Sequence, residues 1–407
     1  MSVTVHQTPE AYSLIYNPQM FLALSTQIAQ PNFVYRVVIT DLVSSDTLTY
    51  DVPADPDGYC RFNGSPFGRR NFSHYIPMNL YGWQKSTSIR KIRVNIGEYY
   101  GTTPAYTAGS NFDWICWNGV ENVEDWCDFD YTNYIYDESA SNFKYLSSQL
   151  PAKAYEDRSD YFYVNTQGAG DFERIRVRTY TTSGSLEGEF YIDNPHDAST
   201  TYTDKYLCID VGVKGLTEIA SMLVTVNAGA LPIIKSTTGS YIIAEANPTS
   251  GVDVSYRDIK TYTIGCEPRF PIYTIHFVRK NGAVQTIHFN KRSDFSSTKE
   301  QEFYGVYPYV RSGSTYTYSR STRFQRPLAT ETNDQLLLKT DWLTSGEVDL
   351  YRELFDSPHI WLDLGSDQEY RILKLVDNTY KLNKSWNEKL FSLSMNFEYT
   401  NTNYRQL

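Results

Sequence analysis

The chain has 407 residues, of which 37 are basic and 47 are acidic, so its formal net charge is −10. No stretch approaches the roughly 18 consecutive apolar residues of a membrane-spanning helix, and we expect no membrane partner. The acidic balance argues against a protein that coats nucleic acid, so we do not expect nucleic acid as a partner. The five cysteines lack a Cys-x-x-Cys spacing and the N-terminus lacks a secretory signal, which together predict free thiols and synthesis in a reducing cytoplasm.

The first section of the chain, residues 1–105, reads as a small β-sandwich. Residues 33–39 are β-branched and aromatic, and residues 89–96 place their apolar side chains on one face. The turn signal Pro56-Asp57-Gly58 lies between these two strands.

Residues 106–154 lack a clear period and combine acidic with aromatic side chains, so we interpret them as an irregular connection or insertion. Flat aromatic rings beside acidic groups can bind a sugar, which makes the tryptophans candidate contacts for a glycan or a protein partner. They are Trp114, Trp117 and Trp126. Nothing in the spacing fixes two carboxylates at the separation that glycoside hydrolysis needs. We therefore favour a solvated acidic loop over glycan binding, and glycan binding over hydrolysis.

A second sandwich is predicted over residues 155–262, where short strands alternate with turn signals. Arg174, Arg176 and Arg178 alternate with aliphatic residues and so share one predicted face. That face is either a water-exposed sheet surface or a subunit contact, because arginine pairs well with carboxylates at interfaces. With Arg69 and Arg70 of the first section, these three residues form our candidate assembly surface.

Residues 263–407 form a predicted C-terminal β-rich domain whose clearest signal is Asn281-Gly282. This pair predicts a hairpin with a two-residue loop, in which both residues have positive φ. The resulting register places His276 and His288 on opposite faces of the hairpin, where they cannot share a metal ion.

The end of the chain carries the only strong helix signal. Thr344 and Glu347 have the spacing of a capping box, and apolar residues then recur at helical intervals, which predicts a helix over 344–356 that ends before Pro358. Residues 391–399 alternate between apolar and polar, as in a half-buried antiparallel strand. The predicted fold is thus mainly β: two to three antiparallel β-sandwich modules of immunoglobulin or fibronectin-III type in series, with one short C-terminal α-helix.

Catalytic motifs are missing from the sequence. It contains no Gly-x-Ser-x-Gly, no cysteine in a recognisable catalytic signature and no glycine-rich loop that opens a helix. We therefore expect no enzyme activity, no cofactor and no metal.

Short motifs in a fixed order carry a resemblance to a known family. They are Gln7-Thr8-Pro9-Glu10-Ala11-Tyr12, Tyr16-Asn17-Pro18, Gly97-Glu98-Tyr99-Tyr100-Gly101, Cys266-Glu267-Pro268-Arg269-Phe270, Trp342-Leu343-Thr344, Ser357-Pro358 and Phe397-Glu398-Tyr399. In this order they resemble an uncharacterised family of virion structural proteins from tailed phages of Bacteroidetes, including crAss-like phages. The chain departs from that family at Asn63-Gly64-Ser65-Pro66, where an Asp-Ile/Leu-Ser-type helix start is expected.

The resemblance implies a structural role in the tail, baseplate or neck of a virion, after synthesis in the host bacterial cytoplasm, and no catalytic residues. Expected partners are other copies of the chain in a ring or symmetric assembly, other tail or neck proteins and, as a further candidate, a host surface glycan. Charge segregation, acidic at 121–138 and basic at 69–93 or 174–178, suits head-to-tail contacts. A receptor- or glycan-binding tail-fibre module is the alternative, followed by a polysaccharide depolymerase.

Overall fold

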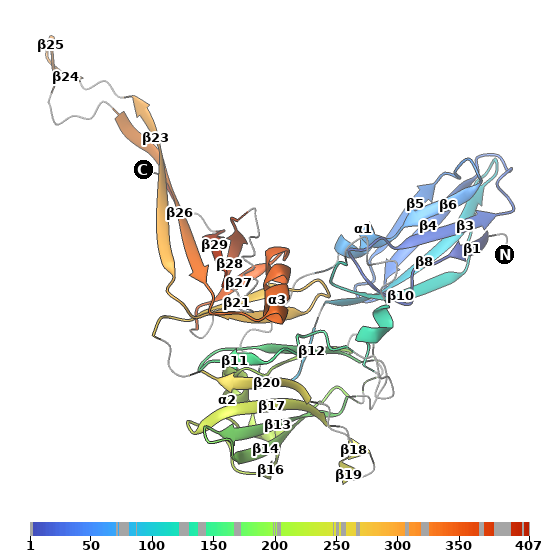
Figure 1. The fold of residues 1–407 in the computed structure, drawn as a ribbon. Helices are drawn as coiled ribbons and strands as arrows, with labels where there is room; N and C mark the ends of the chain where they lie inside the picture. Colours follow the sequence, from blue (N-terminus) through green and yellow to red (C-terminus); the bar gives the residue numbers. More distant parts are fainter. Residues whose placement is uncertain are drawn as a thin grey trace. The chain divides into compact units, whose positions relative to one another are not determined.

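The computed structural model describes all residues except 1–2, 71, 73–80, 87, 122–129, 137–143, 167–171, 198, 200, 202–204, 247, 250–251, 254–257, 266–268, 306–308, 319–324, 366–369, 378–391, 401–402 and 407. Strand makes up 52% of it and helix 10%, with several antiparallel sheets, so the predicted mainly-β class is confirmed. Two compact units are present (Figure 1). Unit 1 comprises residues 1–267 and 277–286, and unit 2 comprises residues 268–276 and 287–407. The finer four-segment division of the sequence remains a prediction.

The first sandwich of unit 1 is built from two sheets that share one core. The smaller sheet has the order β1 (Val3–Gln7), β3 (Met20–Ser25) and β6 (Tyr59–Asn63). The larger has the order β2 (Tyr12–Leu14), β10 (Asn111–Trp117), β8 (Ile89–Tyr100), β4 (Val34–Asp41) and β5 (Thr47–Val52), with β9 (Ala105–Thr107) paired to β8. Phe21 of β3 packs in the same core as Val94 of β8, so the alternation read from the sequence does bury one face of β8. A short helix, α1 (Ser65–Arg70), follows β6.

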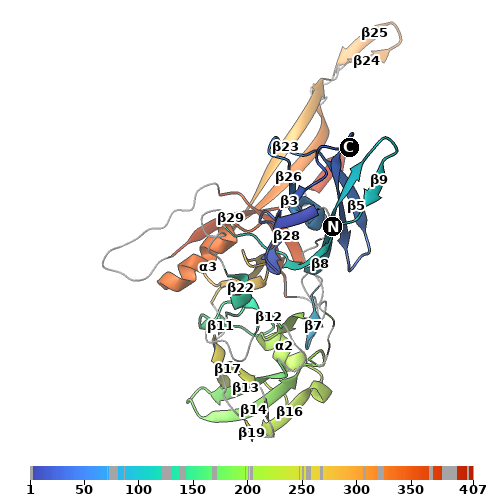
Figure 2. The ribbon, with the colours of Figure 1, turned by 90° about the vertical axis from the view of Figure 1, so that its right-hand side faces the viewer.

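The second sandwich of unit 1 also has two sheets around a single core (Figure 2). The larger has the order β11 (Ala152–Ala154), β20 (Asp258–Ile264), β17 (Thr238–Ala246), β13 (Arg174–Thr181), β14 (Leu186–Asp193) and β16 (Val224–Ala228). The smaller has the order β12 (Tyr161–Asn165), β15 (Tyr206–Asp210) and β7 (Gln84–Lys85), and α2 (Val213–Glu218) follows β15. Short elements complete the unit: η1 (Tyr131–Tyr134), η3 (Ser221–Leu223), and the paired β18 (Pro248–Thr249) and β19 (Val252–Asp253).

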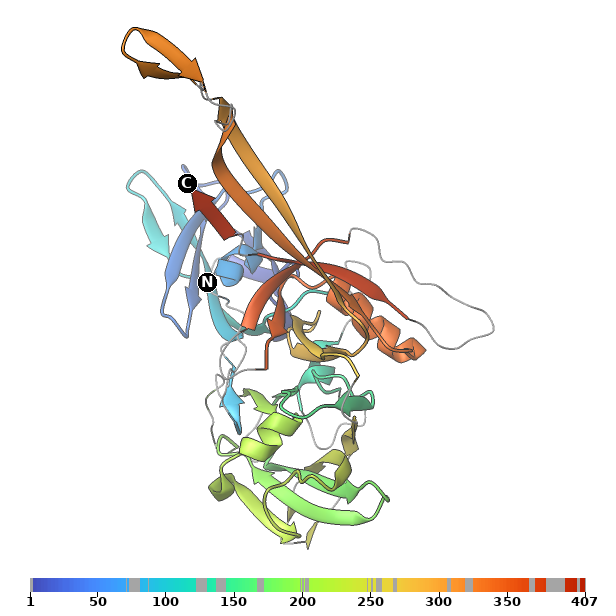
Figure 3. The same ribbon diagram turned by 90° about the vertical axis from the view of Figure 1, so that its left-hand side faces the viewer.

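Unit 2 is organised around a sheet that ends in a long ribbon (Figure 3). Its order is β22 (Val284–Phe289), β21 (Tyr273–Val278), β27 (Ile360–Asp363), β28 (Tyr370–Leu375), β29 (Ser394–Tyr399), β26 (Gln325–Lys339) and β23 (Asp294–Gly305), and β30 (Asn403–Gln406) pairs with β26. β24 (Tyr309–Ser312) and β25 (Thr315–Tyr318) form a separate small hairpin. Met395 and Phe397 of β29 are buried while Ser394 is exposed, which confirms the predicted half-buried strand. In the part of the chain described, no helix is long and apolar enough to cross a membrane.

The hairpin of β21 and β22 differs from the prediction by one residue. Gly282 has a φ of 85°, whereas Asn281 is not among the residues with positive φ. The Gly282 N–H donates to the Arg279 carbonyl at 2.9 Å, and the Arg279 N–H donates to the Ala283 carbonyl at 2.8 Å. These bonds define a type I turn closed by a left-handed glycine, which is a three-residue loop rather than a two-residue loop.

The longer loop shifts the register, so the prediction that His276 and His288 lie on opposite faces is wrong. The Thr274 hydroxyl lies 3.0 Å from His288 Nδ1, and this contact requires the two side chains to share a face. Thr274 and His276 are two residues apart on one strand, so His276 shares that face too. His276 is fully buried, with Nε2 3.8 Å from Asp363.

The predicted helix is confirmed as α3 (Ser345–Phe355), which Thr344 caps. Glu347 Oε2 accepts hydrogen bonds from the Thr344 N–H at 2.7 Å and from the Thr344 hydroxyl at 2.8 Å. Val348, Tyr351 and Leu354 form the buried face of the helix.

Replacing Thr344 with alanine should lower the free energy of unfolding of unit 2 by about 1 kcal/mol, because the capping hydroxyl is lost. Urea denaturation followed by circular dichroism measures the change. Thr344→Ser keeps the hydroxyl and should retain most of the wild-type stability. Equal losses in the two variants would show that the hydroxyl does not stabilise the helix.

Candidate assembly surface

The arginines of β13 do not form the exposed stripe that the sequence predicts. Arg176 is only 3% exposed, with Nη2 3.9 Å from Asp258, so its place on an assembly surface is wrong. β13 is an interior strand between β14 and β17, and neighbouring side chains on both sides cover it. Arg178 forms an ion pair with Glu189, and the Arg174 guanidinium lies 4.6 Å from the centre of the Tyr191 ring.

The two arginines of α1 have different environments. The Arg69 guanidinium donates to the Ser65 hydroxyl at 2.9 Å and to the Tyr16 carbonyl at 2.7 Å, which anchors the helix to the segment after β2. Arg70 is exposed at the last residue of the helix. The five candidate arginines therefore do not act as one surface: Arg69 and Arg70 are exposed, whereas Arg174 and Arg178 are half-buried and Arg176 is buried.

Two of the three candidate tryptophans are core residues. Trp114 is 2% exposed and packs with its ring centre 5.4 Å from that of Phe21, and Trp117 is 0% exposed. Both belong to β10, which lies between β2 and β8, so residues 111–117 are a regular strand and not an irregular connection. The prediction that Trp114 and Trp117 contact a glycan is wrong, because neither ring is accessible. Trp126 lies outside the described residues.

A long and highly exposed strand, β23, pairs with β26 in a ribbon that we call the arm. Their antiparallel pairing runs from Asp294–Leu337 to Gly305–Gln325. Every residue of β23 after Asp294 is exposed. On the other side of β26, β29 pairs with residues 335–339 and β30 with residues 329–332. The arm thus extends beyond the rest of the unit 2 sheet (Figure 1).

Apolar side chains gather at the outer end of the arm. Phe303 is 53% exposed, Tyr304 44% and Leu328 54%. They flank a register shift at Glu302 and Phe303, where Leu328 is the extra residue on β26. Phe295, 61% exposed, lies at the inner end of the same strand. Clustered exposed apolar side chains on an otherwise polar element are typical of protein interfaces.

The free edge of β23 adds backbone hydrogen-bonding groups to this surface. Among the described residues, no strand pairs with the side of β23 that faces away from β26. An open edge carries N–H and C=O groups that can pair with another chain. Sequence reasoning missed the arm because residues 296–302 of β23 are all polar, and a strand without apolar alternation gives no periodic signal.

The described cysteines are not candidates for nucleophilic chemistry. Cys60, Cys116 and Cys208 are buried and free. Burial raises the pKa of Cys60 to about 12 and that of Cys208 to about 12, so both remain thiols at neutral pH. Among the residues that the structure describes, no three His, Cys, Asp or Glu side chains gather in a way that could hold a metal ion.

No family model matches the sequence, and no curated protein matches it.

Proposed function

We propose that the protein is a structural component of a tailed-phage virion, in the tail, baseplate or neck, and that it acts by protein–protein assembly. The observation that carries this proposal is the arm. At its outer end, beyond the residues that pair with β30, the arm consists of β23 and β26 alone, and a two-stranded ribbon of this kind is marginally stable on its own. A partner that covers Phe303, Tyr304 and Leu328 would supply the apolar burial that the isolated arm lacks.

The ordered motifs of the sequence also support a virion role, through their resemblance to tailed-phage structural proteins. The mainly-β build fits it, since sandwich modules give rigid bodies with large lateral surfaces. The glycan-binding alternative depended on accessible tryptophans, and two of the three, Trp114 and Trp117, are buried. We therefore favour assembly through the arm over recognition of a sugar.

Replacing Phe303 and Tyr304 together with serine should weaken self-association at least about 30-fold. Aromatic anchors of an interface contribute about 2 kcal/mol or more each, and both residues are exposed before assembly. Sedimentation velocity over a concentration series measures the shift from oligomer to monomer. Phe295→Ser is the matched control, because it removes an exposed aromatic ring from the inner end of the same strand.

The proposal fails if the double variant associates as tightly as the wild type while Phe295→Ser does not. It also fails in its self-assembly form if the wild-type protein stays monomeric at every concentration.

A further inference from the structure

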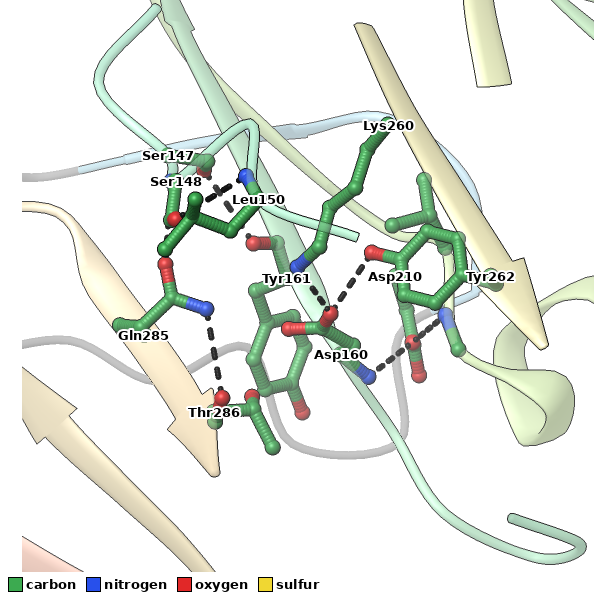
Figure 4. Close-up of polar contacts among 12 residues, drawn as sticks. Ser147, Ser148, Leu150, Asp160, Tyr161, Asp210, Lys260, Tyr262, Gln285 and Thr286 are labelled. Carbon is green, nitrogen blue, oxygen red and sulfur yellow. Dashed lines mark hydrogen bonds and ion pairs between the residues drawn. The ribbon is translucent and has the colours of Figure 1, made fainter. Parts of the chain in front are cut away.

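Three ionisable side chains meet in the core of the second sandwich (Figure 4). Asp160 immediately precedes β12, Asp210 ends β15, and Lys260 lies in β20 of the opposite sheet. Their exposed fractions are 5%, 2% and 7%. The packing around them is tight: a Cβ at Gly215 of α2 would lie 2.4 Å from the Asp210 carboxyl carbon. Bulk water is therefore largely excluded from the site.

The lysine and one carboxylate are in direct contact. Lys260 Nζ lies 2.9 Å from Asp160 Oδ2, and the Tyr262 hydroxyl donates to the same oxygen at 2.6 Å. Lys260 and Tyr262 both lie on β20 and share one face of it, so a single strand positions both donors against Asp160. The Tyr241 ring stacks on that of Tyr262 at 4.7 Å between centres and covers the site.

The second carboxyl group lies beside the first. Asp210 Oδ1 accepts hydrogen bonds from the Asp160 N–H at 3.0 Å and from the Gly212 N–H at 2.9 Å. Burial raises the pKa of Asp210 to about 7, and the charge of Asp160 contributes to the increase. The other titratable groups that face Asp210 are Cys208, Tyr241 and Tyr262, whose pKa values are also raised, chiefly by burial. Near neutral pH the site therefore holds a carboxylic acid that can donate a proton.

Burying Lys260 and Asp160 as a pair of ions costs desolvation free energy. Removing both charges from water carries a penalty that their attraction only partly offsets. A neutral amine in contact with a carboxylic acid is the reactant pair for amide formation. Fixed positions and excluded water are the two conditions under which such a pair reacts without an external catalyst.

We propose that Lys260 and Asp160 join in an intramolecular isopeptide bond, with Asp210 as the neighbouring acid. Lys260 Nζ attacks Asp160 Cγ and forms a C–N bond, and the carboxyl C–O bond breaks. Asp210 gives a proton to the departing oxygen and recovers one from the attacking nitrogen. One amine and one carboxylic acid become one amide and one water molecule, so the step needs no oxidant, reductant or cofactor.

The bond would tie the two sheets of the second sandwich together covalently. It links β20 of the larger sheet to the residue that immediately precedes β12 of the smaller sheet, across 100 positions of the sequence. Once the amide has formed, a pulling force cannot separate the two sheets without breaking a covalent bond. None of these contacts involves the arm, so formation of the bond does not depend on which partner the arm binds.

Intact-protein mass spectrometry of the folded wild type decides the proposal. The expected mass is lower than the sequence mass by one water molecule, and a protease digest should contain one branched peptide with both Lys260 and Asp160. Lys260→Arg keeps the positive charge but cannot form the amide, so it should show the full sequence mass. Cyclisation at Asp57-Gly58 would also remove a water molecule, but Lys260→Arg would retain that loss. The full sequence mass in folded wild type overturns the proposal, as does a water loss that persists in Lys260→Arg.

The role of Asp210 is tested by the rate of bond formation. Unfolded wild-type chain that still has the full mass is refolded at a series of pH values, and the lighter species is followed with time. The rate should fall as pH rises through about 7, since Asp210 then loses its proton. Asp210→Asn should fold and remain at the full mass. Bond formation in Asp210→Asn at the wild-type rate would exclude Asp210 from the reaction.

Discussion

Replacing Trp117 with alanine should lower the free energy of unfolding of unit 1 by about 3–5 kcal/mol, the range for truncation of a fully buried tryptophan. Trp117 is 0% exposed and is among the largest fully buried side chains of the molecule. Its ring contacts that of Tyr131 edge to face at 6.3 Å, and its Nε1 donates to the Asn281 carbonyl at 3.1 Å. Alanine would leave a cavity and remove the donor, so the Asn281 carbonyl would lose its partner.

Denaturant unfolding followed by circular dichroism measures this loss. Trp342 is the matched control, because it is 59% exposed and its replacement with alanine should change stability by no more than about 0.5 kcal/mol. Similar stabilities of the two variants would contradict a packing role for Trp117.

The same substitution shows why tryptophan scanning could not have identified a glycan site here. A Trp117→Ala variant that fails to bind a sugar would have lost its core first, and the lost binding would say nothing of a contact. Exposure has to be established before an alanine variant can report on recognition, and Trp114 and Trp117 do not meet that condition.

Local signals predicted the parts of the fold that local physics determines. The helix at 345–355 follows from the capping pair Thr344 and Glu347 together with an apolar face, all within one short segment. The alternation of β8 and β29 predicted their buried faces, because a strand with one wet side must alternate.

Errors arose where neighbours distant in sequence decide the outcome. Arg176 is buried because β14 and β17 flank its strand, and a single alternating segment cannot reveal whether it is interior or at an edge. The hairpin register depended on whether Asn281 adopts positive φ. The Asn-Gly pair is compatible with a two-residue loop and with the three-residue loop that forms, so the sequence alone did not distinguish them.

The buried charged site could not be read from the sequence at all. Asp160, Asp210 and Lys260 are 50 positions apart from one to the next, and no motif connects them. Only the pairing of β12 with β15 and the packing of the two sheets around one core bring them together. The arm was missed for a different reason. Its strand β23 is exposed and polar over residues 296–302, so the sequence there has no apolar alternation to indicate a strand.

Unit 1 should lose stability as pH rises from about 4 to about 7, and Asp210→Asn should remove most of that loss. The pKa of Asp210 is raised from 3.8 in the reference state to about 7 in the folded protein, first by burial and then by the charge of Asp160. Between these values the folded state keeps a proton that the unfolded chain has released, so the stabilising contribution is complete below about pH 4 and is lost as pH rises through about 7. A difference of about three pH units corresponds to on the order of 4 kcal/mol.

Asparagine at position 210 does not titrate, yet its side-chain oxygen can still accept from the Asp160 and Gly212 N–H groups. Urea unfolding of both proteins at several pH values gives the slope of the free energy of unfolding against pH. This slope should be steeper for the wild type than for Asp210→Asn between about pH 4 and about pH 7. Asp193→Asn, at an exposed carboxylate that ends β14, should keep the wild-type slope. Burial is the largest cause of the raised pKa and persists after an amide has formed at Asp160, so the direction of the effect is the same in cross-linked and uncross-linked protein. Parallel slopes for wild type and Asp210→Asn would mean that Asp210 is ionised in the folded core, and the acid that the isopeptide reaction requires would then be missing.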